Sequence, residues 1–241
     1  MTLKLEDAQV ACGLNPSHLI STTPSGPLLH EAAFAAWLFL QERAGSEGFA
    51  LKIESGWRSF DKQLSIWNRK ACGELPLLDP TGKKIDALQL NPTERMWAIL
   101  HWSALPGTSR HHFGSDLDVS DAKAIPLGYE VQLTPQEVAP NGIFGHLHSW
   151  LDQVIAEGNS FGFFRPFVTG KGSIQPERWH LSHAPTARTI ERKFDPQILR
   201  ALLCEHKIEL LDEIFKHWNV ILAQYCFAYY QDPPSTGIID V

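Results

Sequence analysis

Two spacings of apolar residues alternate along most of the chain: the helical period of about 3.6 and the strand period of two. Residues 31–43 have the helical spacing, with Phe34, Leu38 and Gln41 on one face. Residues 49–54 alternate apolar and polar side chains, as a half-buried strand does. Similar patterns predict helices over residues 60–72, 92–100 and 142–157, and strands over residues 116–119, 161–169 and 179–182. Together they predict an α+β fold, in which helices flank a small, mainly antiparallel sheet.

The pattern becomes purely helical from Asp195 onward. Asp195-Pro196 is a favourable helix start, because proline tolerates the first helical position. Apolar residues then repeat at helical spacing, which predicts two helices packed on the main body. We therefore expect a main domain over residues 1–190, a helical C-terminal extension over residues 191–231 and a flexible tail over residues 232–241.

The composition is that of an ordinary globular protein. The chain has 241 residues, of which 44% are hydrophobic and 20% charged, so it can bury a sizeable core. A formal net charge of −6 with scattered basic residues argues against a nucleic-acid partner. The four cysteines include no CxxC pair, which favours free thiols in a reducing compartment.

Two stretches bear on location. Residues 1–7 lack the charged-then-apolar pattern of a signal peptide. The most apolar stretch, residues 32–40, is too short to cross a bilayer, so no membrane span is expected. As written, the sequence predicts a cytoplasmic protein, or a periplasmic one if a leader was removed. It leaves the oligomeric state open.

Two segments carry the residue types of a metal site. His111 and Asp118 are separated by Gly114, which lets the chain turn the histidine back toward the carboxylate. Asp116 and Asp118 share one face of the strand expected there. His180 belongs to a later strand. Two imidazoles and one carboxylate are the ligand set of a hydrolytic metal site that keeps one position open.

Most of the eleven histidines have a simpler interpretation, since a single histidine is more often exposed or hydrogen-bonded than a ligand. Those on helical segments are His101, His146, His148, His206 and His217. His112 and His183 lie beside proposed ligands. Because adjacent strand residues point to opposite sides, His112 is expected to lie behind the ligands or to be exposed.

Three segments, in the same order as in the family, resemble the M15 zinc peptidases, the D-alanyl-D-alanine carboxypeptidase and dipeptidase family. The resemblance covers residues 30–184. The family pattern SxHxxGxxxD is matched by Ser109, His111, Gly114 and Asp118, and the pattern ExWH by Glu177, Trp179 and His180. The family segment SGYRS is matched by Ser55-Gly56-Trp57-Arg58-Ser59, with tryptophan in place of tyrosine.

The resemblance implies a role for each matched residue. The zinc ligands that it implies are His111, Asp118 and His180. Glu177 would be the general base that accepts a proton from the attacking water. Arg58 would hold the terminal carboxylate of the substrate or polarise the scissile carbonyl, and Gln63 and Ser109 would also bind substrate. The implied fold is that of the D,D-peptidases and hedgehog domains, and residues 1–190 would form the zinc peptidase domain.

Three further positions bear on the site. Asp116 stands where the family has a small alanine, and it is expected to add negative charge near the metal. Arg165, before Pro166, loosely resembles a family arginine, with an ordinary salt bridge as an equal alternative. Glu177 and His180 are three residues apart, so a regular strand would place them on opposite faces. We therefore expect a late strand start, with Glu177 on a bend.

Other classes of protein share parts of this pattern. Ser59-Phe60-Asp61-Lys62 fits the SxxK motif of serine carboxypeptidases, but no Ser-Asp-Asn or Lys-Thr-Gly segment accompanies it. Non-haem iron oxygenases use two histidines and a carboxylate, but usually place the first two ligands as HxD. A non-catalytic module with a hedgehog-like fold would not need Glu177 and Arg58. A zincin is excluded, because His30-Glu31-Ala32-Ala33-Phe34 lacks the second histidine of HExxH.

We therefore expect a zinc metallopeptidase, specifically a D,D-carboxypeptidase. It would hydrolyse a peptide bond near the D-alanyl carboxyl terminus of peptidoglycan precursors or fragments, so its partner would be a peptide with that terminus. The same site could serve a free D-Ala-D-Ala dipeptidase or a peptidoglycan endopeptidase. The residues alone do not distinguish these three activities, and they do not determine the stereochemistry at the scissile bond.

Overall fold

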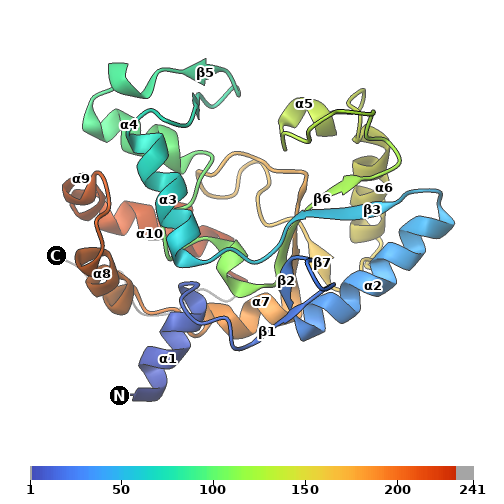
Figure 1. The fold of residues 1–241 in the computed structure, drawn as a ribbon, viewed down its shortest axis with the longest axis horizontal. Helices are drawn as coiled ribbons and strands as arrows, with labels where there is room; N and C mark the ends of the chain where they lie inside the picture. The colour runs from blue at the N-terminus through green and yellow to red at the C-terminus, as the bar shows by residue number, and fades with distance from the viewer. Residues whose placement is uncertain (1, 232–241) are drawn as a thin grey trace.

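The computed structural model describes residues 2–231, with side chains from residue 5 onward (Figure 1). At its centre lies a four-stranded antiparallel sheet in the order β3-β6-β8-β7. The strands are β3 (Leu51–Ser55), β6 (Asp116–Asp121), β8 (His180–His183) and β7 (Phe163–Phe164). Helices lie on both sides of this sheet in Figure 1, which confirms the expected α+β fold with a small antiparallel sheet.

The central sheet has one apolar face and one polar face, because successive side chains of a strand point to opposite sides. Leu117, Val119 and Leu181 pack with α2 (Glu31–Ser46) and α6 (Gly145–Ala156) in one hydrophobic core. The alternating residues on the same strands include Asp116, Asp118 and His180. Folding thus buries half of each strand in a core and presents the other half to the opposite side, where a site can form.

The buried face of α2 differs from the expected one. Leu38 is 48% exposed and Gln41 is exposed as well, so the face predicted from Phe34, Leu38 and Gln41 was wrong. The helix instead buries a broader stripe with its own helical spacing: Ala33, Ala36, Trp37, Leu40 and Ala44. Apolar residues surround most of this helix, so their spacing fixed the period without selecting the row that meets the sheet.

Helix starts with a local polar cap follow the prediction closely. Ser59 caps α3 (Phe60–Ala71), accepting a hydrogen bond from the Lys62 amide at 3.1 Å. Asp195 caps α8 (Pro196–Glu205) in the same way. Such caps are set by a side chain and a backbone amide only two or three residues away, so they are visible in the sequence.

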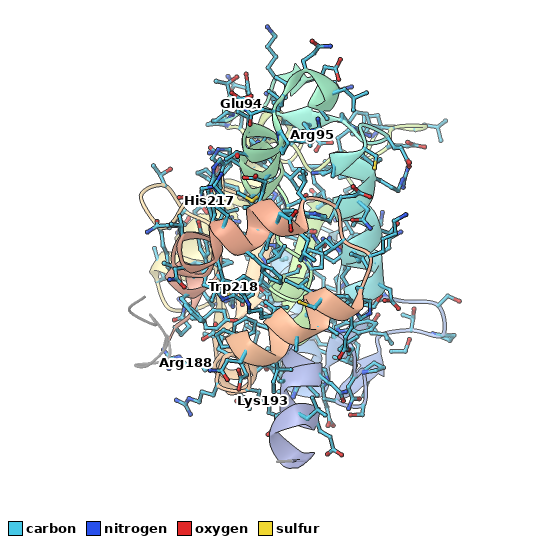
Figure 2. All side chains as sticks on the ribbon, turned by 90° about the vertical axis from the view of Figure 1, so that its left-hand side faces the viewer. Glu94, Arg95, Arg188, Lys193, His217 and Trp218 are labelled. Atoms are coloured by element: carbon cyan, nitrogen blue, oxygen red, sulfur yellow. The ribbon has the colours of Figure 1, made fainter. Side chains whose placement is uncertain are left out.

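Residues 192–231 form three α-helices rather than the two helices expected: α8, α9 (Leu211–Lys216) and α10 (Trp218–Tyr225). The break falls at His217, whose backbone angles of φ −111° and ψ 17° interrupt the helix. Figure 2 labels His217 and Trp218 at this turn. These helices share a second hydrophobic core with α3 and α4 (Pro92–Leu100). The division of the chain at residue 190 stays a prediction, and the tail predicted over residues 232–241 lies outside the described residues.

The remaining elements are short or peripheral. Of the strand expected over residues 161–169, only β7 forms. The others are α1 (Thr2–Ala11), β1 (Leu19–Ser21), β2 (Leu28–His30), β4 (Leu77–Leu78), β5 (Lys84–Ile85), η1 (Ala87–Gln89), η2 (Arg110–Phe113), α5 (Pro135–Val138), α7 (Ala184–Glu191) and η3 (Phe227–Tyr229). Across residues 2–231, every helix is too short or too polar to cross a bilayer.

Candidate metal centre and active site

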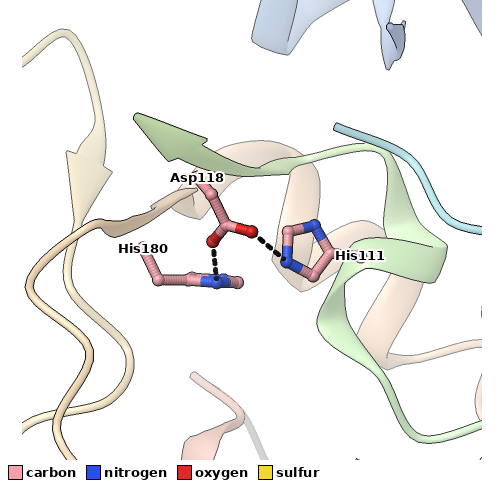
Figure 3. A group of neighbouring side chains, drawn as sticks. All are labelled: His111, Asp118 and His180. Atoms are coloured by element: carbon pink, nitrogen blue, oxygen red, sulfur yellow. Dashed lines mark hydrogen bonds and ion pairs between the residues drawn. The ribbon is translucent and has the colours of Figure 1, made fainter. Parts of the chain in front are cut away.

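His111, Asp118 and His180 converge on the polar face of the sheet, and their candidate ligand atoms all lie within 4.8 Å of one another (Figure 3). Asp118 lies directly opposite His180 in the register of β6 and β8, so strand pairing brings these two together. His111 comes from the short η2 helix before β6. Gly114 ends η2 with φ 69°, a left-handed conformation that glycine adopts without strain.

Hydrogen bonds fix which nitrogen of each histidine faces the centre. Nδ1 of His111 lies 2.9 Å from the carbonyl oxygen of Gly56. A carbonyl can only accept, so Nδ1 carries the proton and Nε2 keeps a lone pair, 3.2 Å from Asp118. His180 has the reverse arrangement: its Nε2 lies 2.9 Å from Asp116, and its Nδ1 lies 3.1 Å from Asp118. Each ring is thus oriented by a bond on its far side, as in known metal sites.

The charges at this centre suit a cation. Burial opposes ionisation of Asp118, but His111 and His180 hold its pKa well below the usual range. Burial likewise opposes the charge of His180, whereas its hydrogen bonds to Asp116 and Asp118 raise its pKa above the ordinary value. The site therefore favours positive charge between the carboxylates. Two imidazole nitrogens and a carboxylate oxygen match the donors that zinc takes in hydrolytic sites, so the residues present fit this metal.

Asp116 brings a negative charge next to the candidate ligand His180, and Arg110 compensates that charge. Its carboxylate is fully buried and lies 2.9 Å from Nε of Arg110, and it also accepts a hydrogen bond from Ser115. Burial raises the pKa of Asp116, but Arg110 and then His180 lower it to about 2. Arg110 further contacts Glu191 at 2.8 Å. Asp116 is therefore the ionised group that receives the His180 proton.

Glu177 lies at the turn that leads into β8. Its carbonyl accepts a hydrogen bond from the His180 amide at 3.1 Å, and this tight turn brings its carboxylate to 3.7 Å from Nδ1 of His180. The strand begins at His180, so the expected late start and bend are confirmed. Burial raises the pKa of Glu177 to about 7, although the neighbouring charge of His180 opposes this. A carboxyl group with such a pKa can both accept and release a proton near neutrality.

Arg58 is held in place by neutral groups. Its guanidinium donates to Gln63 Oε1 at 2.9 Å and to Ser55 Oγ at 3.4 Å. Its backbone amide bonds the carbonyl of His111 at 3.1 Å, and its own carbonyl lies 2.6 Å from Nδ1 of His112. His112 is fully buried and thus lies behind the ligands, one of the two positions expected for it.

Gln63 and Ser109 have different relations to the site. Gln63 is fully buried behind Arg58, and its amide nitrogen donates to the Ala104 carbonyl at 2.7 Å. Gln63 is not among the residues that line the cavity described below, and its predicted contact with substrate stays a prediction. Ser109 starts η2 and lines the same cavity as His111. Arg165 pairs with Asp152 at 2.6 Å, which is the salt-bridge alternative.

A cavity of about 310 Å³ opens onto the candidate metal centre. Arg58, Ser109, Glu177 and the three candidate ligands line it, together with apolar side chains such as Trp102 and Trp179. Lys70 and Ser103 also line it, and sequence reasoning missed both. One signal was available for Lys70: it follows Gln63 by seven residues on α3, two helical turns along the same face.

Comparisons with known proteins agree with these features. Residues 26–186 match the family model described as D-alanyl-D-alanine carboxypeptidase, VanY. Two proteins of Haemophilus influenzae, both described as uncharacterized, are similar to this chain. One is 29% identical over 123 residues, which is 50% of this chain and 92% of the relative. The other is 37% identical over 100 residues, which is 40% of this chain and 68% of the relative.

A solved structure shares the fold, and a second is similar to the chain. The LdcB LD-carboxypeptidase, whose structure concerns peptidoglycan recognition, is 19% identical with a TM-score of 0.50; the match covers 85% of this chain and 80% of that one. VanYB in complex with D-alanine-D-alanine is 20% identical with a TM-score of 0.47, covering 78% and 89%. Because the family model spans the sheet and every motif of the candidate site, the chain belongs to the D-alanyl-D-alanine carboxypeptidase (VanY) family of M15 peptidases.

Proposed function

We propose that this protein is a zinc-dependent D,D-carboxypeptidase that removes the terminal D-alanine from peptidoglycan precursors or fragments. The observation that carries the proposal is the carboxylate of Glu177, 3.7 Å from the candidate ligand His180 and in the same cavity as Arg58. A base beside three ligand residues suits hydrolysis, and an arginine that forms no salt bridge with a carboxylate of residues 5–231 suits an anionic substrate. Membership of the VanY family over residues 26–186 supports the same substrate class.

The metal would be held by Nε2 of His111, the carboxylate of Asp118 and Nδ1 of His180. When bound, zinc supplies Lewis acidity, which acidifies water and polarises a carbonyl. The protein contributes the orientation of the ligands. Gly56 and Asp116 accept the remaining ring protons of His111 and His180, so both rings present a lone pair to the same point.

Glu177 would move the proton that hydrolysis requires. As the water oxygen forms its bond to the scissile carbon, the Glu177 carboxylate accepts a water proton. As the carbon–nitrogen bond breaks, the carboxylic acid passes that proton to the leaving amine. A pKa of about 7 lets one group perform both steps, because neither protonation state is strongly favoured at neutral pH.

Arg58 would stabilise negative charge on the substrate. Its guanidinium carries a full charge in a half-buried position, where partial burial lowers its pKa and the charges of Asp118 and Glu177 oppose that effect. Gln63 and Ser55 hold the side chain without neutralising it. A fixed cation in a poorly solvated site acts strongly on charge that develops during the reaction.

A substrate panel tests the proposal. Zinc-loaded protein is incubated with free D-Ala-D-Ala, with a muramyl pentapeptide ending in D-Ala-D-Ala and with intact peptidoglycan, and the products are identified by mass spectrometry. We expect the pentapeptide to lose one alanine residue, while the Glu177→Ala variant leaves it intact. Cleavage of the free dipeptide alone would assign a dipeptidase. Release of muropeptides from peptidoglycan, with no trimming of the pentapeptide, would assign an endopeptidase.

A further inference from the structure

Lys70 is a cation of the active-site cavity to which the proposed function gives no role. It belongs to the last turn of α3, and its side chain lines the same cavity as Arg58 and Glu177. Its ammonium donates to Ser103 Oγ at 2.6 Å. Within residues 5–231 it forms no salt bridge with a carboxylate. Lys70 is half-buried, and a lysine that loses part of its hydration without a partner anion is unfavourable unless a ligand supplies one.

The surroundings of Lys70 support this interpretation. Burial lowers its pKa to about 8; the negative charge of Glu177 opposes that effect, and the positive charge of Arg58 adds to it. Lys70 therefore lies within electrostatic reach of both groups and remains mostly protonated at neutral pH. An ammonium group has three donors, so the single hydrogen bond to Ser103 leaves donors for a ligand.

The charges of the cavity separate into two sets. Arg110 also lines the cavity, but Asp116 and Glu191 neutralise it at 2.9 and 2.8 Å. Arg58 and Lys70 lack such partners in the described chain. A carboxypeptidase substrate brings two negative centres: a permanent terminal carboxylate, and a scissile carbonyl oxygen that becomes negative during the reaction. Two unneutralised cations match these two centres.

We propose that Lys70, oriented by Ser103, binds the terminal carboxylate of the substrate, which leaves Arg58 for the scissile carbonyl oxygen. This assignment rests on the proposed function. It also distinguishes the two roles considered for Arg58. The backbone of Arg58 is bonded to His111 and His112, so its guanidinium is fixed beside the metal ligands, where the reacting carbonyl must lie. Lys70 comes from the far end of α3 and reaches the cavity next to Ser103.

Binding measurements test Lys70 independently of turnover. Zinc-loaded wild-type protein and the Lys70→Met variant are titrated calorimetrically with N-acetyl-D-alanine and with its carboxamide. We expect the wild type to prefer the acid, and Lys70→Met to bind the acid about 10- to 100-fold more weakly with unchanged affinity for the amide. In the wild type, the preference should fade above pH 8 as the lysine loses its proton. Equal affinity of the two proteins for the acid would overturn the assignment.

Matched variants guard against a structural explanation. Lys62→Met removes an exposed lysine from the same helix and should leave both affinities unchanged. Lys70→Arg keeps the charge and should recover part of the preference for the acid. If Lys70→Met does not fold, as judged by its thermal melt, Lys70→Gln takes its place. Ser103→Ala should weaken binding of the acid less than Lys70→Met does.

Kinetics separate the inference from the proposed function. With a D-alanyl peptide, Lys70→Met should raise KM more than it lowers kcat, whereas Arg58→Lys should mainly lower kcat. Suppose that the wild type cuts no such peptide, and that the preference for the acid over the amide is present in the wild type and absent in Lys70→Met. The carboxylate site then stands and the proposed function falls. If the peptide is cut and Lys70→Met has an unchanged KM, the proposed function stands and the Lys70 assignment falls.

Discussion

Nε2 of His180 lies 2.9 Å from the carboxylate of Asp116, and this contact turns the opposite nitrogen of the ring toward Asp118 and Glu177. Asp116 is ionised beside Arg110, so its carboxylate accepts the hydrogen bond from the Nε2 proton of His180. The position that departs from the family pattern thus gives His180 an orienting partner. Such a partner both fixes the tautomer of a histidine and makes it a better ligand.

Asp116→Ala should therefore weaken zinc binding about 10- to 100-fold, the usual effect of losing a carboxylate that orients a ligand. Competition with a chromophoric chelator measures this without any assay of activity. Asp116→Asn is the matched comparison, because an amide oxygen can still accept the proton from Nε2. A similar loss in both variants would point to charge rather than orientation, and an unchanged affinity in both would remove Asp116 from the site.

His180→Ala should lose most of its zinc, because only His111 and Asp118 would remain as ligands. Metal analysis after dialysis measures this directly. Full occupancy in the variant would remove His180 from the ligand set. Chelation of the wild type should also lower its melting temperature, since a ligand that binds only the folded state stabilises that state.

Glu177→Ala should keep its zinc and its melting temperature but lose about 10² to 10⁴ in kcat, the range for a general base. The side chain is close to His180 yet is not one of the three candidate ligands, so metal content and activity should separate. Turnover near the wild-type rate would assign the base elsewhere. Loss of zinc in this variant would instead place Glu177 among the ligands.

Arg58 should act through its planar fork and not through charge alone. Arg58→Lys keeps the charge but loses the planar guanidinium, two nitrogens of which bond Gln63 and Ser55, so we expect kcat to fall about 10²-fold or more. Gln63→Leu should lower kcat less, because Arg58 is still present and loses only its hydrogen bond to Gln63. If Gln63 acts through Arg58, the double variant should be no worse than Arg58→Lys. Full additivity would give Gln63 a separate role.

Lys70 predicts a specific pH dependence of stability. Its pKa is lowered to about 8 in the folded protein, whereas an unfolded lysine keeps a value near 10.4. The unfolded state therefore binds more protons between these values, and the wild type gains stability as pH rises through them. In ligand-free protein, Lys70→Met should be more stable than the wild type at pH 7, with the difference narrowing toward pH 10. Paired thermal melts across this range check the sign.

Contacts between near neighbours in the chain, and motifs in a recognisable order, made much of this structure predictable from the sequence. The caps at Ser59 and Asp195 depend on bonds between near neighbours, and α4 begins and ends where its pattern does. The candidate ligands were found because ligand chemistry restricts residue type, and their segments occur in a recognisable order. His111, Asp118 and His180 do converge in space.

Features that depend on distant partners were not predictable in this way. The pairing of Arg110 with Asp116 and Glu191 joins a helix turn, a strand and the end of α7. Lys70 meets Ser103 across 33 positions of the chain. Neither contact follows from periodicity, because each is decided by how the elements pack. The exposed face of α2 was misjudged for the same reason.

The Arg110 guanidinium also bonds the carbonyl of Tyr229 at 3.0 Å, only two residues before the end of the described chain. During synthesis, residues 109–183 are added to the chain before this carbonyl exists. We therefore expect the strands that carry Asp118 and His180 to reach their full stability only after the C-terminal helices have folded against them. A chain cut after residue 205 would carry every motif of the family. It would still lack the Tyr229 carbonyl that holds Arg110 against Asp116.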